Sequence, residues 1–247
     1  MAGIVAGAMA LTRFEWVRVI DLASRGVVSA EFIAIMAAVV ITLAVILLLG
    51  RIRLDDLAFN PDYAARGIAI AVMIWSAAQV IGVIPRVVAN RPVLLDPAFE
   101  YGSRWAMAGD LLTALARATL EETVFRGFLF IQLYLLLARQ AVRLQNRIPL
   151  AASGVALASI LVALPQGISL QVTQQASLHL GIIVAFSLFL TWIFFRTRNI
   201  FFTIGVHALL LAPTSIVAGP HSGGRWFAPL VIAILAGVWA LLWPRRD

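Results

Sequence analysis

The chain has 247 residues, of which 62% are hydrophobic and 13% are charged, and its mean hydropathy is +0.97. This composition argues against a soluble globular domain, because the apolar runs are longer than those of a soluble core helix. Cysteine is absent, which excludes disulfides, thiol nucleophiles and thiolate metal sites.

Seven apolar segments predict an all-α protein, a polytopic transmembrane helical bundle with additional interfacial helices. Crossing a hydrocarbon core of about 30 Å takes about 20 helical residues. The segments are too long for the short alternating strands of an outer-membrane barrel. The predicted spans are residues 31–50, 67–89, 105–138, 149–164, 174–195, 200–218 and 226–243.

The domain organisation is predicted to be a single membrane domain. Residues 1–104 would contribute an N-terminal interfacial segment and two spans, and residues 105–247 the catalytic membrane core. The first eleven residues are apolar but lack a basic region, so an interfacial helix is expected there instead of a cleaved signal peptide.

The net charge is +7, and all 19 basic residues are arginine. Such a charge is compatible with nucleic acid or with lipid headgroups, and its distribution favours lipid, with no role for nucleic acid. Ten arginines fall in short loops on one face of the predicted bundle and six on the other, which predicts a cytoplasmic C-terminus by the positive-inside rule. The ten are Arg51, Arg53, Arg66, Arg139, Arg143, Arg147, Arg196, Arg198, Arg245 and Arg246.

The segment 105–138 is unusual because it carries charges inside an apolar stretch. As one helix its 34 residues would measure about 50 Å, so we expect it to break or to lie partly along the membrane interface. Asp110, Thr113, Arg117 and Glu121 recur at steps of three or four and predict a polar stripe on one helix face. Because charged groups are costly in a bilayer, they predict a functional site.

Two pairs within this segment are spaced to form ion pairs one helical turn apart, namely Arg117 with Glu121 and Glu122 with Arg126. Two carboxylates in a medium of low dielectric constant are suited to general-base chemistry, with water activation as the natural use. The alternative is a buried salt-bridge network that only holds helices together. The residues alone leave both readings open.

Two stretches resemble the CAAX protease and bacteriocin-processing family of intramembrane endopeptidases, also called the CPBP or Abi family. ATLEETVFRGFLF, at residues 118–130, is similar to the family's first motif, and RTRNIFFTIGVH, at residues 196–207, to its last. The resemblance covers roughly residues 105–215. It implies an integral membrane protein, with a bacterial plasma membrane as the expected location, that cleaves a membrane-anchored or membrane-adjacent protein or peptide.

The resemblance also implies roles for single residues. Glu121 would activate a water molecule for attack on a peptide carbonyl, with Glu122 and Arg126 in support. His207 matches the later of two family histidines, which act either as ligands of a proposed metal or as polarising groups in a metal-free mechanism.

The chain departs from the family pattern at its middle motif and after the last histidine. In ASILVALPQG, Val162 replaces a Phe and Gln166 replaces a His, and Leu211 stands where an Asn or Asp is usual. Gln166 could donate a hydrogen bond to an oxyanion, but glutamine is a poor zinc ligand.

Zinc therefore stays undecided at this stage, with Glu121, His207 and His179 as the candidate ligands if the metal is bound. His179 would otherwise occupy a packing or membrane-facing position. His221, within GPHSGG, is interpreted as a solvated loop residue.

The leading function is thus an intramembrane endopeptidase. A catalytically inactive protein of the same fold, with a binding, chaperone-like or immunity role, is the main alternative because motif residues are missing. A transporter that uses the buried charges as a proton relay is a third, disfavoured because the chain shows no internal repeat. The charge count places the site towards the non-cytoplasmic half, whereas the family's prenyl-protein processors act on cytosolic substrates. The sequence does not reconcile the two.

Overall fold

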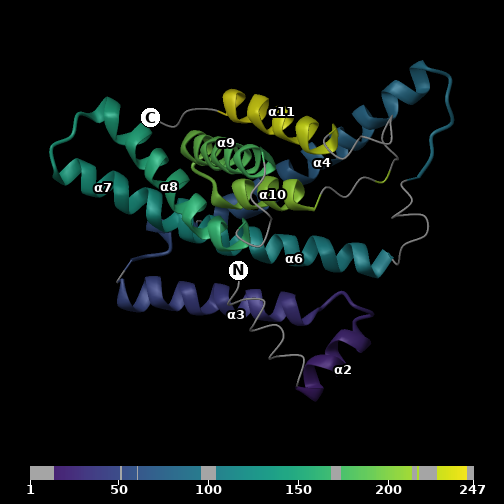
Figure 1. The fold of residues 1–247 in the computed structure, drawn as a ribbon, viewed down its shortest axis with the longest axis horizontal. Helices are drawn as coiled ribbons and strands as arrows, with labels where there is room; N and C mark the ends of the chain where they lie inside the picture. Colours follow the sequence, from purple (N-terminus) through teal and green to yellow (C-terminus); the bar gives the residue numbers. More distant parts are fainter. Residues whose placement is uncertain are drawn as a thin grey trace.

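The computed structural model describes residues 14–50, 52–59, 61–95, 104–167, 174–212, 216 and 227–243, and the regular elements in these ranges are all helices. For residues 162–167 and 174–180 the description covers the backbone alone. In chain order (Figure 1) the elements are α2 (Glu15–Ala23), α3 (Ala30–Ala44), the π-helical turn η1 (Val45–Leu49), the 3₁₀ turn η2 (Asp55–Leu57), α4 (Pro61–Val88), α6 (Arg104–Glu122), the π-helix η3 (Thr123–Phe130), α7 (Ile131–Arg139), α8 (Leu144–Gly167), α9 (Gln174–Thr197), α10 (Ile200–Leu211) and α11 (Phe227–Leu242).

The first two predicted spans are confirmed as helices long and apolar enough to cross a membrane, at Ala30–Leu48 and Pro61–Val88. The predicted segments 149–164, 174–195 and 226–243 coincide with α8, α9 and α11 as helices. Shorter apolar helical stretches occur at Gly181–Thr197, Ile200–Leu211 and Ala228–Leu242. The arrangement of seven spans itself stays a prediction.

The predicted span 200–218 was wrong as a single helix. α10 ends at Leu211, and Ala212 has the non-helical angles φ −125° and ψ 78°. Its 12 residues measure about 18 Å, well short of a membrane core. Pro213 follows in the sequence, and a residue that precedes proline is disfavoured in the helical conformation.

The charged segment, which was expected to break or to lie partly along the membrane interface, does not break, and its place along the interface stays a prediction. α6, η3 and α7 follow one another without interruption from Arg104 to Arg139, and Figure 1 shows them crossing most of the width of the molecule. The change comes instead in the hydrogen-bonding pattern, which becomes π-helical immediately after Glu122. Short π-helical segments within α-helices are frequent at functional sites.

α10 lies at the centre of the bundle, in contact with α4, α6, α9 and α11. Its first turn is fixed by Asn199, whose Oδ1 accepts a hydrogen bond from the Phe202 backbone N–H and whose Nδ2 donates to the carbonyl of Tyr63 at the start of α4. Gly67 of α4 is required by this closeness, because a Cβ there would lie 2.7 Å from the backbone nitrogen of Phe202. These contacts fix the start of α10 against α4, and α10 packs against α6 as well.

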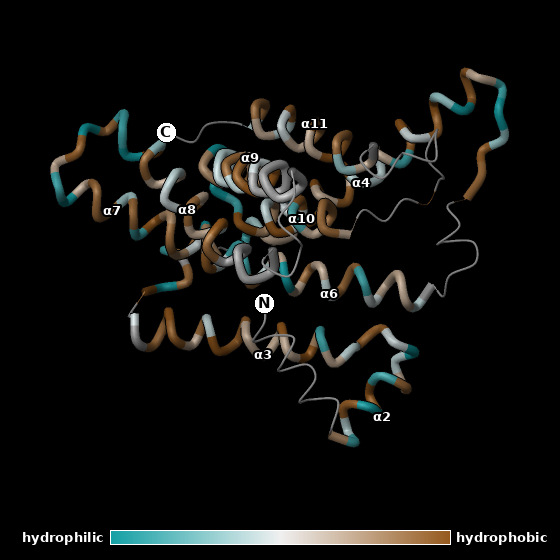
Figure 2. The backbone as a smooth tube through the Cα atoms, in the orientation of Figure 1, coloured by the Kyte–Doolittle hydropathy of each residue, from teal (hydrophilic) through white to brown (hydrophobic). Residues whose placement is uncertain are grey.

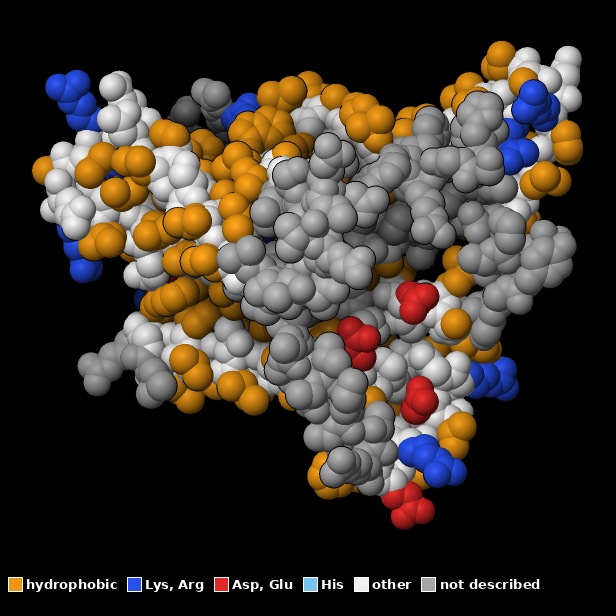
Figure 3. Space-filling model, viewed as in Figure 1, with side chains coloured by type: hydrophobic (Ala, Val, Ile, Leu, Met, Phe, Trp, Pro, Cys, Tyr) orange, Lys and Arg blue, Asp and Glu red, His pale blue; other side chains and the backbone are white. Residues whose placement is uncertain are grey.

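Much of the surface is hydrophobic, as expected of a protein embedded in lipid. Large apolar side chains are exposed along α3 and α4, including Val40, Ile41 and Val88. Figure 2 shows α3 as mainly hydrophobic, the short helix α2 as mixed, and the connection between α7 and α8 as hydrophilic. In Figure 3 hydrophobic side chains cover much of the visible face, while the visible acidic side chains gather over α6, α3 and α2.

Candidate active site

The four residues predicted to carry chemistry and described with their side chains lie together at the contact between α6, η3 and α10. Glu121 and Glu122 end α6, Arg126 lies in η3, and His207 comes from the middle of α10. The two predicted ion pairs are both present. Arg117 Nε lies 2.9 Å from Glu121 Oε1, and Arg126 Nη1 lies 3.0 Å from Glu122 Oε1.

Glu122 is the buried centre of this group, with no exposed side-chain surface. Its Oε1 accepts the hydrogen bond from Arg126 and lies 2.7 Å from Nδ1 of His207. A carboxylate oxygen that already accepts from a guanidinium acts as an acceptor towards the imidazole too, so Nδ1 of His207 is the donor. Oε2 of Glu122 has no hydrogen-bond partner among the described residues.

The hydrogen bond to Glu122 determines how the His207 ring is oriented. With Nδ1 directed at Glu122, Nε2 faces Glu121 and lies 3.7 Å from its Oε2. The Phe186 ring packs edge-on against the imidazole, with centroids 5.1 Å apart. The distance between Nε2 and Oε2 is too long for a direct hydrogen bond and suits two groups that share one water molecule.

Glu121 differs from its neighbour because its side chain keeps 26% of its surface exposed. It is flanked by the half-buried guanidinium of Arg117 on one side and by His207 on the other. The arrangement therefore presents one accessible carboxylate beside an imidazole whose orientation is fixed from behind.

Sequence reasoning missed two serines that hold Arg126. Its Nη2 donates to the backbone carbonyl and to Oγ of Ser187 on α9, at 2.8 and 3.1 Å. Ser159 Oγ on α8 lies 3.0 Å from Ser187 Oγ. Both serines occur inside apolar helical stretches, and this was the available signal, since small polar residues in membrane helices commonly bond across to a neighbouring helix.

A pocket of about 490 Å³ lies next to the site. Three residues of the predicted polar stripe, Asp110, Thr113 and Arg117, line it together with Glu31 of α3 and Leu211 at the end of α10. Arg117 also pairs with Glu121, so the pocket and the accessible carboxylate share this arginine.

The two remaining candidates, and the histidine that was interpreted as a loop residue, fall on parts of the chain whose side chains are not described. Gln166 belongs to α8 and His179 to α9, but their side chains lie outside the described residues. His221 lies outside them altogether. Leu211 leaves the pocket wall apolar where the family pattern would place an amide or a carboxylate.

Zinc does not fit the side chains that the structure describes. Within the described ranges, no three or more His, Asp or Glu side chains are grouped so as to hold a metal ion. Glu121 Oε2 and His207 Nε2 would supply two ligands, whereas catalytic zinc sites use three protein ligands.

Comparison with known proteins gave a match to a protein family. The family model described as type II CAAX prenyl endopeptidase Rce1-like matches residues 103–212. The matched range contains the two glutamates, the arginine and the histidine of the site. No curated protein and no solved structure matches the chain.

Proposed function

We propose, from the match of residues 103–212 to the Rce1-like family of type II CAAX prenyl endopeptidases, a family of membrane proteases, that the chain is an active intramembrane endopeptidase. It hydrolyses a peptide bond in a membrane-anchored or membrane-adjacent substrate, with water activated by Glu121. The observation that carries the proposal is the placement of the accessible carboxylate of Glu121 beside Nε2 of His207, which the buried carboxylate of Glu122 orients.

In the first step Glu121 takes a proton from a water molecule held between its Oε2 and His207 Nε2. The water oxygen forms a bond to the peptide carbonyl carbon, and the carbonyl oxygen becomes an oxyanion. Nε2 of His207 faces the same position as Oε2 of Glu121, and when this nitrogen carries a proton it donates a hydrogen bond to the oxyanion. Donors placed in this way contribute about 3–4 kcal/mol of transition-state stabilisation in other hydrolases.

In the second step the intermediate collapses and the carbon–nitrogen bond breaks. The leaving nitrogen takes the proton from Glu121, which returns the carboxylate to its starting form and releases an amine and a carboxylic acid. Glu122 and Arg126 act behind the reacting atoms. Glu122 holds the imidazole in place, as the carboxylate of a catalytic triad does, and Arg126 compensates the buried charge of Glu122.

The pocket beside Arg117 supports the proposal because hydrolysis inside a membrane needs access for water. Its walls carry the charged groups of Glu31, Asp110 and Arg117. Polar lining of this kind keeps a cavity hydrated where apolar walls would leave it dry.

The test compares membrane proteins from cells that carry the wild-type chain with those from cells that carry Glu121→Gln. This substitution removes the proposed base with little change of shape, and terminal peptides are identified by mass spectrometry. We expect new termini with the wild type that are lost with the variant. Glu15→Gln is the matched control, since Glu15 is an exposed residue of α2, and it should keep the wild-type pattern.

The alternative role is a non-catalytic protein of the same fold that binds a membrane partner. Identical terminal peptides from the wild type and from folded, abundant Glu121→Gln protein would contradict the peptidase and favour this role. Restoration of lost activity by zinc after chelation would instead contradict the metal-free mechanism alone.

A further inference from the structure

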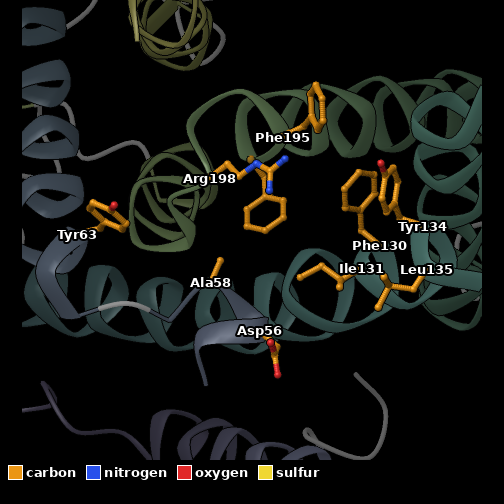
Figure 4. A pocket seen from close by; sticks show the side chains of 10 residues that line it. Asp56, Ala58, Tyr63, Phe130, Ile131, Tyr134, Leu135, Phe195 and Arg198 are labelled. Atoms are coloured by element: carbon orange, nitrogen blue, oxygen red, sulfur yellow. The ribbon is translucent and has the colours of Figure 1, made fainter. Parts of the chain in front are cut away.

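A second pocket, of about 430 Å³, lies away from the candidate active site (Figure 4). It is enclosed by η2, the start of α4, η3 with α7, and the end of α9. Phe130 lines it and follows Glu121 by nine residues, roughly 13 Å along a helix. The volume falls within the range of about 300–1,000 Å³ typical of pockets that bind small ligands.

The walls of this pocket are mainly aromatic and its rim carries a cation. Figure 4 shows the rings of Phe130 and Tyr134 on one side and Phe195 above, with the guanidinium of Arg198 extending over the cavity. The pocket therefore combines an apolar interior with a positive charge at one edge, which suits a molecule with an anionic head and a hydrocarbon tail.

Arg198 is held at the rim by the backbone. It lies in the turn between α9 and α10 with φ 48°, and its side chain is exposed. Nothing in the described part of the chain forms a hydrogen bond or an ion pair with its guanidinium. Its neighbour Arg196 is different, because Nη2 of that residue donates to the carbonyl of Leu241 at 3.0 Å.

Asp56, the acidic residue that lines the pocket, is not placed to repel an anion bound at Arg198. Asp56 accepts a hydrogen bond from the backbone N–H of Arg53 through Oδ2, at 3.1 Å. In Figure 4 its carboxylate points away from the cavity.

We propose that this pocket binds one anionic phospholipid, with the phosphate on Arg198 and an acyl chain among the aromatic side chains. Arg198 belongs to the arginine-rich loops on the predicted cytoplasmic face, where the leaflet carries anionic lipids that attract basic residues. This lipid site does not depend on the proposed peptidase activity and serves to anchor the junction of α9 and α10, about two helical turns before His207.

The proposal is tested by native mass spectrometry of the full chain purified in detergent and mixed with phosphatidylglycerol or phosphatidylcholine. We expect one retained phosphatidylglycerol on the wild type and weaker retention of phosphatidylcholine. Arg198→Gln should weaken phosphatidylglycerol binding about five-fold, the equivalent of about 1 kcal/mol for one basic residue. Inorganic phosphate at millimolar concentration should not displace the lipid.

Two further variants test whether lipid binding depends on this pocket and not on net charge alone. Arg143→Gln removes the same charge from an exposed position outside the pocket and should bind as the wild type does. Ala58→Phe fills the cavity, into which Ala58 points in Figure 4, and should lower retention without any loss of charge.

Equal retention by the wild type and Arg198→Gln would overturn the proposal, as would equal effects of Arg198→Gln and Arg143→Gln. Retention of a farnesylated peptide without retention of phospholipid would make the pocket a substrate-binding site and would also overturn the proposal. Displacement of the lipid by inorganic phosphate would show a site for the phosphate group alone and would contradict the role of the acyl chain.

Discussion

The adjacent glutamates at the end of α6 have opposite environments although they differ by one position. Glu122 is fully buried between Arg126 and His207, whereas Glu121 keeps 26% of its side chain exposed beside Arg117. A residue step of about 100° around a helix is enough to separate them. We therefore expect the two residues to contribute in different ways, Glu122 mainly through stability and Glu121 through the proposed chemistry.

We expect Glu122→Gln to destabilise the protein much more than Glu121→Gln. Removing the carboxylate of Glu122 leaves the buried guanidinium of Arg126 without its counter-charge, which costs about 3–5 kcal/mol. The half-exposed pair of Arg117 and Glu121 is worth only about 0–1 kcal/mol. Thermal unfolding in detergent, followed by tryptophan fluorescence, measures the difference.

The double variant Glu122→Gln with Arg126→Met is the control for that comparison. Because it removes both buried charges, its loss of stability should be smaller than the sum of the two single losses. Equal unfolding temperatures for Glu121→Gln and Glu122→Gln would contradict the assignment of Glu122 as the buried centre.

The sequence alone predicted the side-chain contacts within one helix but not most of the contacts between helices. Arg117 with Glu121 and Glu122 with Arg126 are local pairs, so helical spacing alone predicts them. His207 was placed by the family resemblance, and its contact with Glu122 spans 85 residues. The contact of Ser187 with Arg126 spans 61 residues and depends on how α9 packs, which no local pattern specifies.

At the scale of elements, the approach of α4 to α10 determines where His207 stands. Two glycines allow it. A Cβ on Gly67 would lie 2.7 Å from the Phe202 nitrogen, and one on Gly205 would lie 2.6 Å from the Cβ of Ala71. Small residues permit such close contact between membrane helices, so the site depends on α4 although α4 contributes none of its charged groups.

Gly67→Ala should lower the unfolding temperature and also reduce peptidase activity, because the added methyl group pushes α10 away from α4. Overpacking of this kind costs about 1–3 kcal/mol. Gly82→Ala lies on the same helix with nothing within 4 Å of the added carbon and should be neutral or slightly stabilising. A similar loss in both variants would show that helix flexibility, and not the contact with α10, is what matters.

Helix extents were predictable where a long apolar run ended at polar residues, as for α3, α4 and α11. Two features were not. The end of α10 at Leu211 falls inside an apolar run, and the π-helix at Thr123–Phe130 has no signature in hydropathy. The pattern of apolar residues reports neither feature. The end of α10 follows from Pro213, and the π-helix depends on backbone hydrogen bonding.

At the scale of the whole molecule, the distribution of arginines and the exposed apolar side chains of α3 and α4 predict how the protein is oriented in a membrane. The two candidate spans, Ala30–Leu48 and Pro61–Val88, are long and apolar enough to be the first two crossings. With seven crossings, the loop that contains Arg91 and the loop that contains Arg143 lie on opposite sides, the latter in the cytoplasm.

The absence of cysteine from the chain makes this orientation directly measurable. A maleimide that cannot cross membranes should label Arg91→Cys in intact cells and Arg143→Cys only after permeabilisation. The wild-type chain is the control, since it offers no thiol to the reagent. Labelling of both positions from the same side would exclude the seven-span arrangement.

The continuous helix from Arg104 to Arg139 has a consequence for how this protein can vary in length. The glutamates precede the π-helical segment and the residues that pack α7 against α8 follow it. Deleting or inserting one residue between them turns one half against the other by about 100°, so the glutamates and α7 could not both keep their partners. We expect insertions and deletions to be tolerated in the connection between α7 and α8 and to be eliminated from Thr123–Phe130.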